Sequence, residues 1–194
     1  MIKKFEYNII NILISNDIID ENECEIYAYG LDLLFNTILS TMILFLTGTF
    51  WGKMVECVII ITLFYISQSV GGGFHAKTRR KCMACMFFGL CIAMCLIRAN
   101  LNISILLITG FGSIIVLWSF PLVLHKNKLY LIIEKERLIN RSKTYTCFFL
   151  VLFILFYFKG EYRIINSFSV ALLLCACSRL AAIISKNSMY ILYL

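Results

Sequence analysis

Long apolar segments separated by short polar ones make up most of the chain. The apolar segments are Leu33–Phe50, Met54–Val70, Met83–Ile97, Ile103–Leu124, Tyr145–Phe158 and Phe168–Ser185. A helix needs roughly 17–25 residues to cross the hydrocarbon core of a bilayer, and the third and fifth segments are shorter than that. The pattern predicts an all-α, polytopic integral membrane protein with about six transmembrane helices. The alternative is about four such helices plus re-entrant segments that enter the membrane without crossing it.

The first 30 residues have a different pattern. Apolar residues recur there at near-helical spacing, with polar and charged residues between them. The pattern predicts an amphipathic helix over residues 1–30 that lies in the membrane interface. The segment has no long apolar core and no small-residue cleavage site, so we expect it to stay in the mature protein. Its apolar positions are Phe5, Ile9, Ile12, Leu13 and Ile19.

The composition agrees with a membrane location. Apolar residues make up 61% of the chain, and the mean hydropathy is +0.87. A soluble domain of this size could not bury so much apolar surface, so lipid must be part of the solvent. Because no internal repeat and no long linker divides the sequence, residues 1–194 are expected to form a single membrane-embedded domain.

The positive charges indicate the orientation, because Lys and Arg are retained on the cytoplasmic side of a membrane. If the N-terminus is inside and all apolar segments cross, the outside receives only Lys53, Arg98, Lys159 and Arg163. The inside receives Lys3, Lys4, Lys77, Arg79, Arg80, Lys81, Lys126, Lys128, Lys135, Arg137, Arg141, Lys143 and Lys186. This asymmetry predicts two basic cytoplasmic loops, residues 71–82 and 125–145. The cations do not interleave with an exposed aromatic platform, so we expect no nucleic-acid partner.

The polar segment 71–82 reads Gly-Gly-Gly-Phe-His-Ala-Lys-Thr-Arg-Arg-Lys-Cys and is the first candidate for a functional site. Cys82 stands where the basic loop becomes the next apolar segment, so it should lie at the start of a helix. The unpaired N–H groups there and the neighbouring cations favour a thiolate. On a loop made pliable by glycine, His75 would reach the thiol and act as a general base and acid. The alternative is that the glycines only turn a hairpin and the cations only anchor it.

The chain has nine cysteines. Cys82 and Cys85 form a C-x-x-C pair, which with His75 would suggest a redox pair or a zinc site. His125 is the only other histidine and reads as an ordinary solvated residue, so we expect no metal and no cofactor. Most cysteines in the apolar segments are interpreted as small packing residues, and these are Cys57, Cys91, Cys95, Cys147, Cys175 and Cys177.

The string Gly72-Gly73-Phe74-His75-Ala76-Lys77-Thr78, followed by Cys82, resembles the signature of the accessory gene regulator B family. These are membrane cysteine endopeptidases that process peptide pheromone precursors for quorum sensing in Gram-positive bacteria. The chain length, the amphipathic start and the second basic loop after Pro121 are similar as well. The chain differs at Gln68, because family members commonly carry an arginine seven residues before the histidine.

The resemblance implies a nucleophile, Cys82, and a general base and acid, His75. The substrate would be a precursor peptide with an amphipathic leader and an acidic C-terminal tail. Cleavage would release the tail and leave a Cys82 thioester, from which a thiolactone or lactone ring closes. We expect Gly72, Gly73, Lys77, Arg79, Arg80 and Lys81 to contribute to substrate binding, the cations by attracting the acidic tail. The implied setting is the plasma membrane, with membrane lipid as a partner and a homodimer as a possible assembly.

Another class of function stays open, a non-catalytic transporter or receptor subunit that uses the basic loops for docking. The sequence also assigns no third catalytic residue. The candidates for orienting His75 are Glu25, Asp32, Asn36 and Glu56. Each reads equally well as a surface charge, a helix-start residue or a hydrogen-bonding group between helices. Arg179, inside the last apolar segment, is expected to snorkel toward the inner face.

Overall fold

The computed structural model describes residues 9, 10, 12–16, 19, 20, 24–74, 79–125, 132–184 and 189–191. Most of the amphipathic helix predicted for residues 1–30 lies outside these residues. The chain divides into two compact units, residues 1–44 and 45–194, and the features discussed below lie in the second unit. The single membrane-embedded domain stays a prediction.

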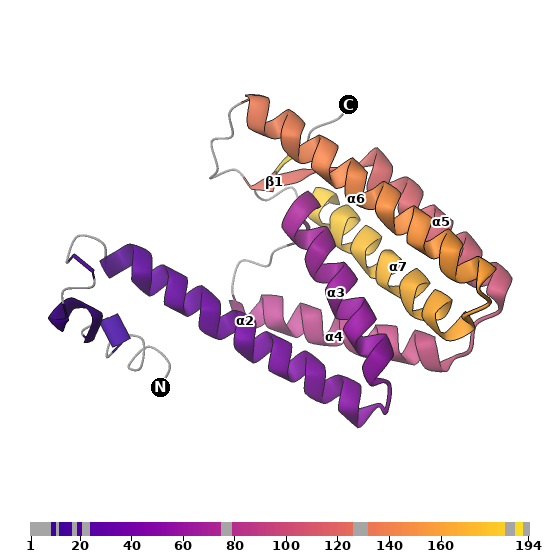
Figure 1. Ribbon diagram of the computed structural model, residues 1–194, viewed down its shortest axis with the longest axis horizontal. Coiled ribbons are helices and arrows are strands. Elements are labelled where there is room, and N and C mark those ends of the chain that lie inside the picture. The colour runs from indigo at the N-terminus through magenta and orange to yellow at the C-terminus, as the bar shows by residue number, and fades with distance from the viewer. Residues whose placement is uncertain are drawn as a thin grey trace. The chain divides into compact units, whose positions relative to one another are not determined.

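Helices account for nearly all of the described structure (Figure 1). They are α2 (Cys24–Phe50), α3 (Met54–Gly71), α4 (Arg79–Arg98), α5 (Ile103–Ser119), α6 (Ile132–Phe158) and α7 (Tyr162–Ile184). Within the described residues, 4 helices are long and apolar enough to cross a membrane, namely α3, α4, α6 and α7. The 17-residue α5 is apolar but shorter. The prediction of an all-α polytopic membrane protein is confirmed.

Two predicted loops are shorter in the structure than in the sequence analysis. Of the loop predicted over residues 71–82, Gly71 still belongs to α3 and residues 79–82 already belong to α4. The loop predicted over residues 125–145 is wrong from Ile132 onward, where α6 has already begun. The reason is that Glu, Lys and Arg are good helix formers and no Gly or Pro interrupts the charged stretch. A helix therefore continues through residues that are too polar for the bilayer core.

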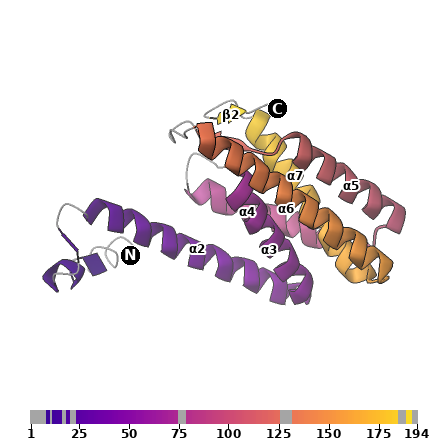
Figure 2. The same cartoon turned by 45° about the horizontal axis from the view of Figure 1, so that its top comes forward.

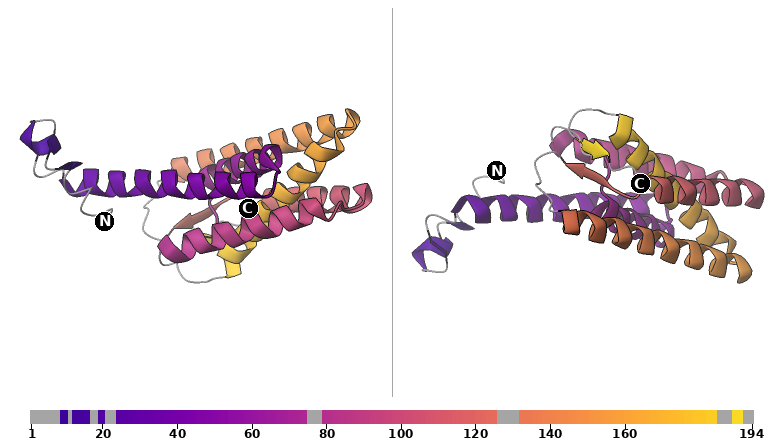
Figure 3. Two further views of the ribbon diagram at one scale, coloured as in Figure 1. Left: turned by 90° about the horizontal axis from the view of Figure 1, so that it is seen from below. Right: turned by 90° about the horizontal axis from the view of Figure 1, so that it is seen from above.

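A short two-stranded sheet adds to the helical fold. Strand β1 (Val123–His125) pairs antiparallel with β2 (Met189–Ile191), with Val123 opposite Ile191. The chain leaves α5 just before Pro121, because a residue that precedes proline is disfavoured in the helical conformation. Figure 2 shows β2 beside the C-terminal end of α7, and the views in Figure 3 agree with this placement.

Helix α7 is the most buried helix of the second unit. It packs most extensively against α5 and α3, and also against α4 and α6 (Figure 1). Small residues on α7, among them Ser167, Ser169 and Ala171, let neighbouring backbones approach closely. On its α6 side, Phe168 packs near the fully buried Phe153.

The helices alternate in direction, so their connections gather at two ends of the second unit. At one end, Asn166 on α7 donates a hydrogen bond to the carbonyl of Ile97 on α4. At the other end, Arg179 on α7 contacts the carbonyl of Pro121 and lies against Gly71. We call this second end the glycine-loop end, because the segment 72–78 leaves α3 there.

Candidate functional site

Cys82 lies in the first turn of α4, at the fourth residue of the helix. Its thiol is free, and the residue is partly exposed. The Cα–Cβ bonds of a helix tilt toward its N-terminus, so this side chain is directed toward the start of α4. Backbone N–H groups without an intrahelical partner and the positive end of the helix dipole are found there. The exposed Lys81 precedes Cys82 on the same turn.

The other residues predicted for the site are covered only in part. His75 and Lys77 lie outside the described residues, which stop at Phe74 and resume at Arg79. The backbone of Arg79 and Arg80 opens α4, while their side chains are not among those described. The zinc alternative is untested for the same reason, because it needs the side chains of His75 and His125.

Gly72 and Gly73 are closely packed. Gly72 has a φ of +67°, a left-handed conformation that favours glycine, and a Cβ there would overlap the carbonyl oxygen of Val123 in β1. A Cβ on Gly73 would overlap the side-chain amide of Gln68. These glycines are expected to make the loop pliable, which stays a prediction. They allow the segment to pass close to β1 and α3.

Ser178 on α7 joins this segment to the helical core. Its Oγ accepts a hydrogen bond from Gln68 Nε2 at 2.6 Å and another from the backbone N–H of Phe74 at 3.2 Å. Gln68 lies on the last turn of α3, and its carbonyl accepts a hydrogen bond from the N–H of Gly72 at 3.1 Å. Helix α7 is thus connected to both the end of α3 and the residue directly before His75.

Arg179, the next residue on α7, is buried with 2% of its surface exposed. Its Nη1 donates to the carbonyl oxygens of Leu117, Phe120 and Pro121, at 3.0, 2.8 and 3.1 Å. Its Nη2 donates to Ser142 Oγ of α6 at 3.3 Å. The prediction that Arg179 snorkels to the surface is wrong. The last carbonyls of α5 lack helical donors, and the guanidinium supplies them.

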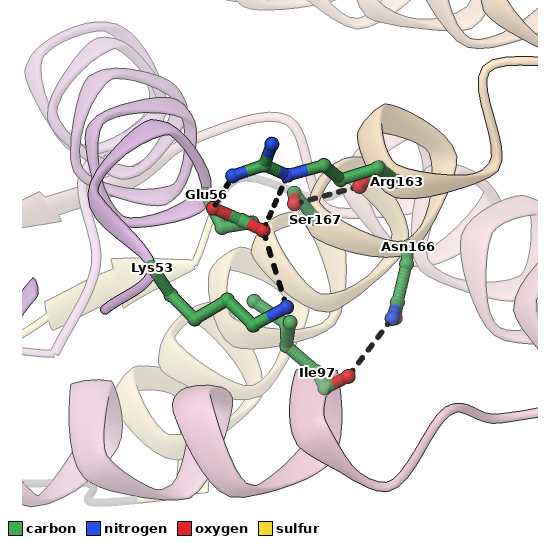
Figure 4. Close-up of polar contacts among 6 residues, drawn as sticks. All are labelled: Lys53, Glu56, Ile97, Arg163, Asn166 and Ser167. Carbon is green, nitrogen blue, oxygen red and sulfur yellow. Dashed lines mark hydrogen bonds and ion pairs between the residues drawn. The ribbon is translucent and has the colours of Figure 1, made fainter. Parts of the chain in front are cut away.

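Glu56 belongs to the opposite end of the unit. Its buried carboxylate accepts hydrogen bonds from Arg163 Nε at 2.6 Å and Nη2 at 2.9 Å, and Lys53 Nζ lies 3.5 Å away (Figure 4). From Glu56 to Gly71 the helix rises about 22 Å. Phe74, the residue directly before His75, donates a hydrogen bond to Ser178, which lies about 22 Å along α7 from the Arg163 that binds Glu56. Glu56 is therefore not the residue that orients His75, and the side chains of the other sequence candidates, Glu25, Asp32 and Asn36, lie outside those described.

The cysteines differ in their surroundings. None of the nine cysteines forms a disulfide, and Cys57 and Cys175 are buried as predicted. Cys95, Cys147 and Cys177 are exposed on helices long and apolar enough to cross a membrane, so for these three the packing interpretation stays a prediction. Cys85 is exposed as well and lies one turn after Cys82 on α4.

Sequence reasoning missed Ser178 entirely and misjudged Arg179. A charged residue inside an apolar helix is itself a signal, because such residues usually face the protein interior and pair with polar groups there. Ser178 gives no comparable signal, since serine is common in transmembrane helices and its partners here are more than 100 residues away in sequence.

Comparison with known proteins supports the sequence resemblance. A family model described as accessory gene regulator B matches residues 6–182, which include α2 to α6, both candidate site residues and most of α7. No match was found among curated proteins or among solved structures. The matched range covers nearly the whole chain and contains the glycine segment, Cys82 and the α7 residues that contact this segment. The chain therefore belongs to the accessory gene regulator B family, the membrane proteins involved in quorum-sensing peptide processing.

Proposed function

We propose that the protein is a membrane cysteine endopeptidase that cuts a pheromone precursor peptide, with Cys82 as nucleophile and His75 as general base and acid. The observation that carries this proposal is the position of Cys82, a free and partly exposed thiol in the first turn of α4. This position matters because a cysteine peptidase needs a nucleophile that its substrate can reach. The family match to peptide processing supports the proposal as well.

In the first step, His75 takes the proton of the Cys82 thiol, and the thiolate attacks the carbonyl carbon of the scissile peptide bond. Backbone N–H groups at the start of α4 stabilise the oxyanion that forms. The tetrahedral intermediate then collapses, and the C–N bond breaks. His75 returns the proton to the leaving amine, and the acidic tail departs with a new N-terminus.

In the second step, the N-terminal part of the precursor is held as a thioester on Cys82. His75 takes the proton of a cysteine or serine within that part, and the sulfur or oxygen of this residue attacks the thioester carbonyl. The C–S bond to Cys82 then breaks, and His75 returns the proton to the departing Cys82 thiolate. The products are a thiolactone or lactone ring and the regenerated enzyme. A thioester retains enough reactivity for this transfer when water is kept from the site, and a position at the membrane surface contributes to that.

Charge supports the proposed substrate and orientation. The segment before Cys82 carries Lys77, Arg79, Arg80 and Lys81 and no acidic residue. The first turns of α6 carry Lys135, Arg137 and Arg141 together with Glu134 and Glu136, so positive charge is in excess there as well. A cluster of this sign attracts an acidic peptide tail by long-range electrostatics. It also favours a site on the cytoplasmic face of the plasma membrane of a Gram-positive bacterium. The proposal includes a homodimer in that membrane, with the amphipathic leader of the precursor at the lipid interface.

The proposal is tested by replacing the two central residues. Cys82→Ala and His75→Ala should each abolish cleavage of a precursor with an amphipathic leader, a central cysteine or serine and an acidic tail. Both variants should still insert into membranes. Cys85→Ala is the matched control, since it removes an exposed thiol one turn later on the same helix and should leave cleavage nearly unchanged.

Mass spectrometry of the wild-type protein should also detect the thioester. The added mass should equal that of the N-terminal fragment minus one water, and it should be absent from the Cys82→Ala variant. Normal cleavage by Cys82→Ala would refute the mechanism. Binding of the precursor without any cleavage by the wild-type protein would favour the non-catalytic docking function instead.

A further inference from the structure

We propose that Ser178 is a positioning residue for the general base, acting through the backbone N–H of Phe74 and together with Gln68. This inference rests on the proposed function, because it assumes that His75 acts as the base. It concerns a residue of the last helix, 96 positions after Cys82.

The first argument is where the contact falls along the chain. Helix α3 ends at Gly71, and its last helical hydrogen bond runs from the N–H of Gly72 to the carbonyl of Gln68, so such bonds do not fix the path of the backbone that follows Gly72. The N–H of Phe74 donates to Ser178 Oγ at 3.2 Å, and Phe74 is the residue directly before His75. This bond therefore fixes the backbone directly before His75.

The second argument is that Ser178 stands on a rigid support. Helix α7 is buried along most of its length, and the neighbouring Arg179 makes four hydrogen bonds to α5, α6 and the segment after α5. A hydroxyl on such a helix moves little. Positioning by a residue that is itself fixed is what a catalytic base requires, since small displacements of a reacting group are costly.

The third argument is that Gln68 completes the arrangement from the side of α3. Its Nε2 donates to Ser178 Oγ at 2.6 Å, and its amide lies against Gly73 so closely that a Cβ there would overlap it. The described part of the structure shows no partner for Gln68 Oε1. The Ser178 hydroxyl thus accepts one hydrogen bond from the Gln68 side chain, which precedes the glycines, and one from the backbone N–H of Phe74, which follows them.

Replacing Ser178 by alanine removes the acceptor that these two N–H groups share. The segment 72–74 would then lose its only described hydrogen bond to α7, and His75 would sample a wider range of positions. A misplacement of about 1 Å reduces catalytic rates by up to about 100-fold. We expect kcat to fall by about 10–100-fold, with KM nearly unchanged because no substrate-binding group is removed.

The experiment uses the full chain, reconstituted in lipid vesicles with the precursor peptide, and compares three variants. Ser178→Ala should show the loss in kcat, and Ser178→Thr should recover most of it because it keeps the hydroxyl. Ser169→Ala is the matched control. Ser169 is a buried serine on the same helix that donates to the carbonyl of Leu106 at 2.9 Å, far from the glycine segment. This variant should keep the wild-type kcat.

The coupling with Gln68 gives a further measurement. If Gln68 and Ser178 act as one unit, Gln68→Leu combined with Ser178→Ala should reduce kcat little more than Ser178→Ala alone. Additive losses would contradict a joint role. An unchanged kcat in Ser178→Ala, or a loss that threonine does not recover, would overturn the inference while the loss of cleavage in Cys82→Ala leaves the proposed function standing. Retained cleavage in Cys82→Ala would instead reject the proposed function itself.

Discussion

Gly72 has no space for a side chain. Its backbone is left-handed, with φ at +67°, and its α-carbon faces the carbonyl oxygen of Val123 in β1. Any other residue would meet two penalties there, the backbone strain and the overlap with β1. The segment before His75 is therefore packed between β1, α3 and α7, which gives the candidate base a fixed starting point.

At the residue scale we predict that Gly72→Ala strongly reduces precursor cleavage while membrane insertion is kept. The combination of φ +67° and ψ −178° is one that essentially only glycine adopts, and it costs another residue about 1–3 kcal/mol. A shift away from Val123 would displace the residues that follow. Cleavage assays and membrane fractionation measure the two effects.

A matched glycine on α4 provides the control for this prediction. Gly89 is a helical residue with no atom within 4 Å of a Cβ placed on it. Gly89→Ala should leave cleavage unchanged, because the site has open space and alanine favours the helix. Equal activity of Gly72→Ala and Gly89→Ala would contradict the packing argument.

The sequence predicts the place of a residue within a helix better than its contacts with distant parts of the chain. The change from polar to apolar residues places Cys82 near a helix start, and the structure agrees, with α4 beginning three residues earlier. The hydrogen bonds of Ser178 were not predictable, because they join residues 104 and 110 positions apart. Local patterns show periodicity and helix boundaries but carry no information about such distant pairs.

At the scale of the elements, Arg179 makes the end of α7 a junction between helices. It donates to three carbonyls at and beyond the end of α5 and to Ser142 on α6, and a Cβ on Gly71 of α3 would overlap it. A planar guanidinium can serve several acceptors at once because its donors point in fixed and different directions. One side chain on α7 therefore contacts the end of α5 and Ser142 within α6, and lies against the end of α3.

We predict that Arg179→Ala lowers the thermal midpoint of the detergent-solubilised protein and reduces cleavage. Each buried acceptor left without a donor costs about 1–3 kcal/mol. Arg179→Lys should recover only part of the stability, because an ammonium cannot reproduce the planar geometry.

Arg98→Ala is the control for this charge change. Arg98 is exposed at the end of α4, at the opposite end of the unit, and its replacement should leave the midpoint nearly unchanged. The fluorescence-detected unfolding midpoints of the variants compare these effects. Equal midpoints for Arg179→Ala and Arg98→Ala would show that Arg179 is not a junction.

Helix α6 illustrates why element boundaries were less predictable than element types. Its apolar half was recognised from Tyr145 onward, but the helix begins at Ile132. Its first turns carry Glu134, Lys135 and Arg137, whose charges suit water while their helix propensity is high. A membrane boundary is a change in solvent and not a change in secondary structure, so hydropathy locates the boundary and misses the helix end.

At the scale of the second unit, charged and aromatic residues mark two membrane boundaries. Lys143 Nζ lies 5.5 Å from the ring centroid of Trp118 near the glycine-loop end, as expected for residues at a membrane interface. On α6, Arg141 and Lys159 are separated by about 27 Å along the helix, close to the roughly 30 Å of a hydrocarbon core. The residues of α6 before Arg141 are therefore expected to project from the bilayer.

We predict that the two ends of α6 face opposite compartments. In a cysteine-free background, Lys159→Cys should react with a membrane-impermeant maleimide in intact cells. Lys135→Cys should react only after the cells are permeabilised, because the greater positive charge lies inside. Labelling of Lys135→Cys in intact cells would invert the orientation and place the proposed site outside.

Composition alone was sufficient to predict a membrane protein, because a soluble domain of this size could not bury the surface of a chain that is 61% apolar. The arrangement of the helices was not predictable in the same way. Every transmembrane helix is apolar around most of its circumference, so the sequence gives no clear face that distinguishes a core helix from a peripheral one. That α7 packs against both α3 and α5, and that β1 pairs with β2, follows only from the structure.

The central place of α7 affects how the protein becomes active during synthesis. A ribosome completes Cys82 and the glycine segment long before it reaches Ser178 and Arg179, which lie near the C-terminus. Until then the nascent chain has the proposed nucleophile but lacks the helix that contacts Gln68 at the end of α3 and Leu117 at the end of α5. On our proposal, a chain released early, or one still emerging from the insertion machinery, cannot cut the precursor. Translation itself then delays the peptidase until its last helix has entered the membrane.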